Sequence, residues 1–214
     1  EGLVMTDWAA MNDRVKALKA GLDLEMPRSN GKNDELIVKA VQDGRISTEE
    51  LDAAVENILQ YVKKCVENRK PDVTYSKEKH HELARKIAGE CAVLLKNEGV
   101  LPLKRDAKVA FIGEFAANPR YQGSGSSRIN AHRVANALQA AQGTADVIYA
   151  QGYVAEGSSD DNLLAQAVKV AREAQAAVIF VGLPDSYESE GFDRKHMNLP
   201  DNQNELIEAV CAVQ

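Results

Sequence analysis

The amino-acid sequence predicts an α/β protein whose two halves are built differently. From residue 12 to about residue 97, apolar side chains recur with helical spacing, interrupted once by a short strand-like run. From Asp106 onward, short apolar runs alternate with amphipathic helices. This second pattern is typical of a doubly wound layer, in which helices cover a parallel sheet. We therefore expect a mainly helical first half and a parallel α/β layer in the second half.

The composition is that of an ordinary globular chain. Of its 214 residues, 44% are hydrophobic and 27% are charged, which is enough to build a real core. The net charge is −6 with both signs mixed along the chain, so no basic face is expected to bind nucleic acid or an anionic membrane. The longest apolar runs, such as AAVIFVG, are too short to span a bilayer. The expected partner is a small molecule or another protein, and self-association as a homo-oligomer is compatible with the sequence.

The spacing of cysteines and histidines predicts neither a metal nor another cofactor. The cysteines lack CxxC spacing and lie on apolar faces of predicted helices, so we expect buried free thiols, which favour a reducing compartment such as the cytoplasm. Adjacent histidines on a helix cannot face one metal, and the other two have no partner spacing. Solvated or capping roles are expected for all four histidines. The residues concerned are Cys65, Cys91, Cys211, His80, His81, His132 and His196.

The first half begins with a predicted βαβ unit. A strand at 2–7 (GLVMTD) precedes a helix at 12–21 and a second strand at 22–27, closed by Pro27. Parallel strands need neighbours, so most of the sheet or barrel to which they belong is expected to lie elsewhere. Three amphipathic helices follow, at 33–44, 47–68 and 77–97; in the second, Ser47 or Thr48 with Glu50 fits a capping box. The chain starts without methionine inside an apolar run and stops inside a predicted helix, so both ends are expected to be cut.

The second half alternates strands and helices. We expect strands at 108–113, 145–152 and 176–182, with helices at 129–142, at 162–175 and from about residue 202. Ligands of doubly wound sheets meet the carboxyl ends of the strands. The loops at 114–128, 152–161 and 183–194 are therefore expected to form a site.

Asp7 and Trp8 follow the first predicted strand. An Asp at the end of a barrel strand is placed for chemistry. A Trp beside a carboxylate suits a sugar, because apolar ring faces pack on aromatic rings while hydroxyls need polar acceptors. The alternative, which the pattern leaves open, is that Asp7 caps the following helix and that Trp8 is a core residue.

A concentration of carboxylates follows the strand at 176–182, which we expect to be a central strand. Within YESEGFDR, Glu188 and Glu190 point to the same side of an extended chain, and Gly191 permits a bend. Asp193 and Arg194 are able to form a charge pair or to hold a polar ligand. Neighbouring carboxylates raise one another's pKa, which suits a general acid. From composition alone, a solvated surface loop is an equally good interpretation.

The run GSGSS at 123–127 has two interpretations. It resembles a phosphate cradle opening a helix, and this favours a non-catalytic module that binds a phosphorylated ligand or nucleotide. It lacks both the GxGxxG spacing and the Lys of a P-loop, so a flexible loop beside a ligand is about twice as well supported.

Four blocks of the sequence together resemble glycoside hydrolase family 3, the β-glucosidase group. They are GLVMTDWAAMND with ALKAGLDLEMP, then DGRISTEELDAAVENIL, then HHELARKIAGECAVLLKNEGVLPL, and finally ESEGFDR with the LP and QNELI that follow it. The blocks occur in the family's order and extend over essentially the whole chain.

The resemblance implies the fold of two incomplete domains. Residues 1–70 match the C-terminal part of a (β/α)8-like barrel, residues 71–105 a linker and helix, and residues 106–214 the first half of an α/β sandwich. In the family the active site lies between the two domains. No cofactor or metal is implied.

The resemblance also assigns roles to residues. The TDW segment is similar to the family's nucleophile motif, with Thr6 where Ser is usual, so Asp7 is the implied nucleophile and Trp8 the implied sugar platform. The acid/base falls on Glu188, or on Glu190 if the alignment shifts. Glu190, Asp193 and Arg194 are left to bind substrate. The implied activity is retaining, exo-acting hydrolysis of terminal non-reducing β-linked sugars, with the isolated fragment inactive.

Overall fold

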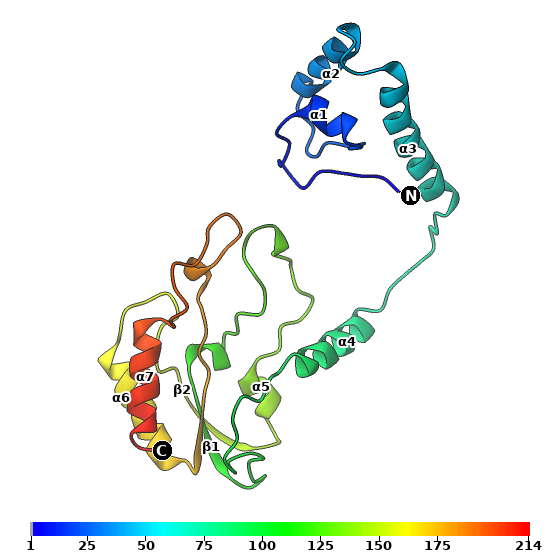
Figure 1. The fold of residues 1–214 in the computed structure, drawn as a ribbon. Helices are drawn as coiled ribbons and strands as arrows, with labels where there is room; N and C mark the ends of the chain where they lie inside the picture. The colour runs from blue at the N-terminus through cyan, green and yellow to red at the C-terminus, as the bar shows by residue number, and fades with distance from the viewer. Residues whose placement is uncertain (1) are drawn as a thin grey trace. The chain divides into compact units, whose positions relative to one another are not determined.

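The computed structural model describes residues 2–214 and divides the chain into two compact units, Glu1–Tyr75 and Ser76–Gln214 (Figure 1). Each unit is described by itself. In the part that the structure describes, no helix is both long enough and apolar enough to cross a membrane.

The first unit contains helices α1 (Arg14–Lys19), α2 (Lys32–Gln42) and α3 (Thr48–Glu67). Its core consists of apolar side chains from α1, α2 and the turn before α3, namely Leu18, Ile37, Ala40 and Ile46. The predicted capping box is confirmed: the Ser47 hydroxyl accepts from the Glu50 N–H at 3.1 Å, and the Glu50 carboxylate accepts from the Ser47 N–H at 2.8 Å.

The two strands expected in the first unit are reduced to one parallel bridge, between Met5 and Leu24. The Val4 carbonyl accepts from the Asp23 and Leu24 N–H groups, and the Thr6 N–H donates to the Leu24 carbonyl at 3.0 Å. A helix, α1, separates the two segments, so the order is that of the expected βαβ unit. Two strands without further neighbours form little regular ladder.

The second unit is a parallel α/β layer in which β1 lies between β2 and β3. Val109 is paired with Val147 on one side and with Ala176 on the other. The sheet order β2-β1-β3 is that of a doubly wound fold and confirms the predicted fold class. The regular elements are α4 (Lys77–Glu90), β1 (Lys108–Ile112), α5 (Ala137–Ala141), β2 (Asp146–Ala150), α6 (Asp161–Glu173), β3 (Ala176–Ile179) and α7 (Asp201–Cys211), with short 3₁₀ turns η1 (Glu114–Ala116), η2 (Gly125–Ser127) and η3 (Asp185–Tyr187).

The core of the second unit lies between the sheet and the paired helices α6 and α7, which run side by side in Figure 1. Small alanines of α6 let this helix approach closely, while larger side chains come from β1, α7 and the segment after β2. The buried cluster is Ala110, Ile112, Ala150, Tyr153, Ala167, Ala171, Leu206 and Val210.

Several sequence-based expectations are wrong in detail. The helix expected at 129–142 shrinks to α5, because the Ile129 N–H is held by the Gln122 side chain at 3.0 Å and Asn136 caps a later start. The helix expected at 77–97 ends at Glu90, and the apolar side chains beyond it are exposed, without the packing that sustains a helix. The strand at 176–182 was expected to be central. Among the described strands its counterpart β3 lies at an edge, and β1 is the central strand.

The three cysteines are also exposed, not buried as expected. Cys65 lies on α3 and Cys211 on α7, and Cys91 follows the end of α4. The apolar spacing correctly indicated a helix face, but it did not indicate whether that face is covered.

Candidate active site

The TDW segment of the first unit is fixed by hydrogen bonds to the end of the second strand-like run. The Thr6 hydroxyl accepts from the Met26 N–H at 2.7 Å and donates to the Met26 carbonyl at 3.1 Å. The Ala9 N–H donates to the same carbonyl at 3.0 Å. A serine would offer the same hydroxyl, so Thr6 preserves the polar function of the residue that it replaces. The backbone on both sides of Asp7 is thereby anchored.

Asp7 and Trp8 do not have the structural roles that were the alternative to a site. The Asp7 side chain is exposed, and its Oδ1 accepts from the Trp8 N–H at 2.7 Å. The cap of α1 is supplied by Asp13, whose carboxylate accepts from the Lys16 N–H at 3.0 Å. Trp8 is 67% exposed, so it is not a core residue of this unit. A carboxylate and an aromatic ring are therefore presented together at the surface of the unit.

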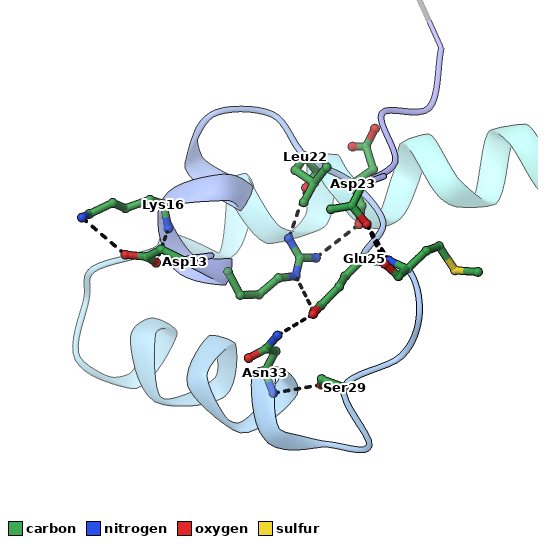
Figure 2. A network of polar contacts seen from close by, with 10 residues as sticks. Asp13, Lys16, Leu22, Asp23, Glu25, Ser29 and Asn33 are labelled. Carbon is green, nitrogen blue, oxygen red and sulfur yellow. Dashed lines mark hydrogen bonds and ion pairs between the residues drawn. The ribbon is translucent and has the colours of Figure 1, made fainter. Parts of the chain in front are cut away.

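A polar network in the first unit holds the two strand-like runs together (Figure 2). Asp23 is buried; its Oδ2 accepts from the Val4 N–H at 2.8 Å and its Oδ1 from the Asn57 amide at 3.0 Å. The Arg14 guanidinium lies 3.8 Å from the Glu25 carboxylate and donates to the carbonyls of residues 22 and 23. Each oxygen of the buried Asp23 side chain thus accepts a hydrogen bond, as buried polar atoms generally require.

In the second unit the three predicted loops meet at the carboxyl ends of the strands. A hollow of about 850 Å³ is lined by residues of the loops after β1 and β3, namely Arg120, Tyr121, Gln122, Gly123, Ser124, Glu188, Ser189, Glu190, Phe192, Asp193 and Arg194. The loop after β2 joins them through Glu156, whose carboxylate accepts from the N–H and the hydroxyl of Ser186. The structure therefore brings four of the six sequence-predicted site residues into one hollow.

The two candidate acids in this hollow have different environments. The Glu190 carboxylate accepts a hydrogen bond from the Ser126 N–H. Hydrogen bonding by the Ser126 side chain and backbone lowers the pKa of Glu190 from its ordinary value. The Glu188 side chain is exposed, and no other residue between 2 and 214 donates to its carboxylate. A general acid must carry its proton near the working pH, and the lowered pKa of Glu190 disfavours that role for Glu190, whose carboxylate holds the loop to Ser126.

Asp193 and Arg194 do not pair with each other. Neither has a salt bridge to another residue of the described part, so of the two roles considered for them, a charge pair or the binding of a polar ligand, the charge pair is absent there. The Arg194 Nε is buried, as is the Ser124 hydroxyl, and neither has a hydrogen-bond partner among residues 2–214. Both line the hollow. Buried polar atoms without partners are costly, so these two are available to a polar ligand.

The GSGSS run does not open a helix. It contains only the 3₁₀ turn η2, and its Ser126 N–H already binds the Glu190 carboxylate. Gly125 has a positive φ of 81°, and a Cβ added there would lie 2.4 Å from the Cβ of Glu190. The glycine is required by this close approach, which leaves no cradle for a phosphate at that position.

The histidines form no metal centre in the described part of the chain, and one arginine of the hollow was not predicted. His132 lies 3.3 Å from Glu78, and no group of three potential metal ligands occurs within residues 2–214. Arg120 was not singled out from the sequence, although it lies within the loop at 114–128 that was expected at the strand ends. The partners of Arg120 are more than 60 positions away along the chain. The only sequence signal for its role was therefore its place in one of the three loops that were expected to meet.

Comparisons with known proteins identify the family. The family model described as "Glycosyl hydrolase family 3 C-terminal domain" matches residues 92–214. The whole chain is 50% identical to thermostable beta-glucosidase B of Acetivibrio thermocellus, of which it covers 29%. It is 39% identical over 99% of its length to an exo-alpha-(1->6)-L-arabinopyranosidase of Bifidobacterium breve, of which it covers 30%.

Solved structures agree with these relatives. A GH3 beta-glucosidase of Bifidobacterium adolescentis superposes with a TM-score of 0.91 at 43% identity, over 100% of this chain and 32% of that one. Beta-glucosidase 3B of Thermotoga neapolitana, solved with alpha-D-glucose, gives a TM-score of 0.76 at 26% identity, over 99% of this chain and 34% of that one. The chain spans about a third of the length of these relatives. By its matched domain and its relatives, the chain belongs to glycosyl hydrolase family 3.

Proposed function

We propose that this chain is part of a retaining β-glycosidase that removes terminal non-reducing sugars, with glucose as the first substrate to test. The observation that carries the proposal is the 50% identity to a beta-glucosidase over 100% of this chain, a range that includes the TDW segment and the loop at 183–194, here called the acidic loop. The exposed Asp7 and Trp8 and the unpartnered Glu188 support it.

In this mechanism the Asp7 carboxylate attacks the anomeric carbon while Glu188 donates a proton to the leaving oxygen. A glycosyl-enzyme ester forms and the glycosidic bond breaks. Glu188, now ionised, takes a proton from water, which attacks the same carbon and releases Asp7. Two inversions give net retention. Trp8 supplies an apolar face for the sugar ring.

The deciding experiment compares Glu188→Ala with Glu190→Ala in the longer protein that contains this chain. Each variant is assayed on an activated nitrophenyl β-glucoside and on an unactivated alkyl β-glucoside, with and without azide. The Glu188 variant is expected to accumulate glycosyl-enzyme from the activated substrate, because that step needs little acid, and azide should release it as glycosyl azide.

The Glu190 variant is the matched control, since it removes a carboxylate two residues away in the same hollow. We expect weaker substrate binding and no azide product. Rescue in the Glu190 variant alone would move the acid/base role to Glu190. If azide rescues neither variant, the acid/base residue does not lie in this loop.

The rival proposal, a phosphate-binding module without catalysis, predicts that a nucleotide stabilises the protein and that sugars do not. The Glu190 carboxylate on the Ser126 N–H disfavours it, because an anion there would have to displace a like charge.

A further inference from the structure

Arg120 contacts the acidic loop at three points. Its Nη1 donates to the Leu183 carbonyl at 3.1 Å, and its Nη2 donates to the Glu188 carbonyl at 3.2 Å. Its Nε lies 3.0 Å from the Asp185 carboxylate. The Arg120 side chain is largely buried, with 21% of its surface exposed. The partially desolvated guanidinium therefore contacts this one loop through two hydrogen bonds and one ion pair.

These contacts tie together the two ends of the segment 183–188. One rigid, planar guanidinium holds the carbonyl groups at both ends of the segment, and the residues between them form the single turn η3. The Tyr187 N–H donates to the Pro184 carbonyl within the turn at 3.1 Å. A lysine could keep the charge opposite Asp185, but as a point charge it would not span both carbonyl groups.

A second loop holds the opposite side of the turn. The Glu156 carboxylate, in the loop after β2, accepts from the N–H and the hydroxyl of Ser186. The turn is thus held by a cation from one loop and an anion from another. Of the two, only Arg120 contacts residue 188 itself.

The Glu188 side chain has no partner of its own in the described part of the chain, so its position depends on where its backbone is held. We propose that Arg120 is a positioning residue for Glu188: by binding the carbonyl groups of Leu183 and Glu188 together, it places the acid/base carboxyl for proton transfer. This inference rests on the proposed function. A shift of about 1 Å at a catalytic group can cost about 100-fold in rate, which sets the size of the expected effect.

The test uses Arg120→Met and Arg120→Lys in the longer protein, beside Arg172→Met as a control. Arg172 is exposed on α6 and takes no part in the site. For each variant, kcat and KM are measured with alkyl and nitrophenyl β-glucosides across pH. We expect Arg120→Met to lower kcat about 100-fold on the alkyl glucoside and less than about tenfold on the nitrophenyl glucoside, because only the poor leaving group needs the placed acid.

Arg120→Lys should recover part of kcat on the alkyl glucoside, and the alkaline limb of its pH profile should lie between those of the wild type and Arg120→Met. Parallel losses on both substrates, or a loss confined to KM, would overturn the positioning role. If Arg120→Met fails to fold, Arg120→Lys carries the same comparison. Glu188→Ala is assayed alongside. If it discriminates between leaving groups and the Arg120 variants do not, this inference alone fails, whereas indifference of Glu188→Ala refutes the assignment of Glu188 as the acid/base and leaves the glycosidase function itself to the azide experiment.

Discussion

Replacement of Gln203 by leucine is expected to loosen the strand end from which the acidic loop departs. Gln203 is 0% exposed on α7, and its side-chain amide binds the backbone of Gly182 twice. The Gly182 N–H donates to Oε1 at 2.9 Å, and Nε2 donates to the Gly182 carbonyl at 2.8 Å. Leucine has a similar size and makes neither bond. The Gly182 N–H and carbonyl would then face an apolar side chain.

The magnitude follows from those two bonds. A polar group left unpaired in a buried position costs about 1–3 kcal/mol. Gly182 is only half-buried, so we expect a total near the lower end, about 2–4 kcal/mol for the pair. Since every 1.4 kcal/mol is tenfold, a local loss of 2 kcal/mol raises the exchange rate of the Gly182 amide roughly 30-fold.

The assay is hydrogen exchange of backbone amides in β1, β3 and residue 182, compared with Gln166→Leu. Gln166 is exposed on α6, so its replacement should change stability by less than about 0.5 kcal/mol. Equal protection of the Gly182 amide in the two variants would refute the reasoning, because it would mean that water or leucine packing replaces both hydrogen bonds.

Three further outcomes are expected. In the longer protein, Asp7→Ala should lower nitrophenyl glucoside hydrolysis by several orders of magnitude, and near-normal turnover would end its assignment as nucleophile. The 214-residue chain alone should not hydrolyse that substrate, since positioning of the sugar contributes much of the rate; measurable turnover by the purified chain would contradict this. Because hydrogen bonding lowers the pKa of Glu190, its contact with Ser126 stabilises the folded loop above the ordinary carboxyl pKa and is lost as pH falls through the lowered value. Protection of the Ser126 amide should therefore decrease only under acidic conditions in the wild type, and a Glu190→Gln variant should show no such pH dependence.

The spacing of apolar residues in the second half was sufficient to predict its parallel sheet and the helices that cover it. Each strand is a short apolar run, and each long helix carries an apolar face, so β1, β2, β3, α6 and α7 follow from local pattern. The capping box at Ser47 could also be predicted from local sequence, because its two partners are only three residues apart.

Contacts between distant residues were not predictable in this way. The hydrogen bonds that truncate the helix expected at 129–142 depend on Gln122, and the support of the acidic loop depends on Arg120 and Gln203. Nothing in the local pattern around Arg120 distinguishes it from any other loop arginine. The distinction between Glu188 and Glu190 likewise required the position of Ser126, 64 residues earlier than Glu190.

The close approach of Gly125 and Glu190 has a consequence for loop exchange between related enzymes. A grafted acidic loop that keeps Glu190 needs a recipient with glycine at position 125, since a side chain there would occupy the space of the carboxylate. It also needs an arginine at position 120 to receive its two carbonyl groups. The segments 114–128 and 183–194 therefore have to be exchanged together unless the recipient already has these two residues, and a chimaera that lacks them should misplace the carboxylates of the acidic loop.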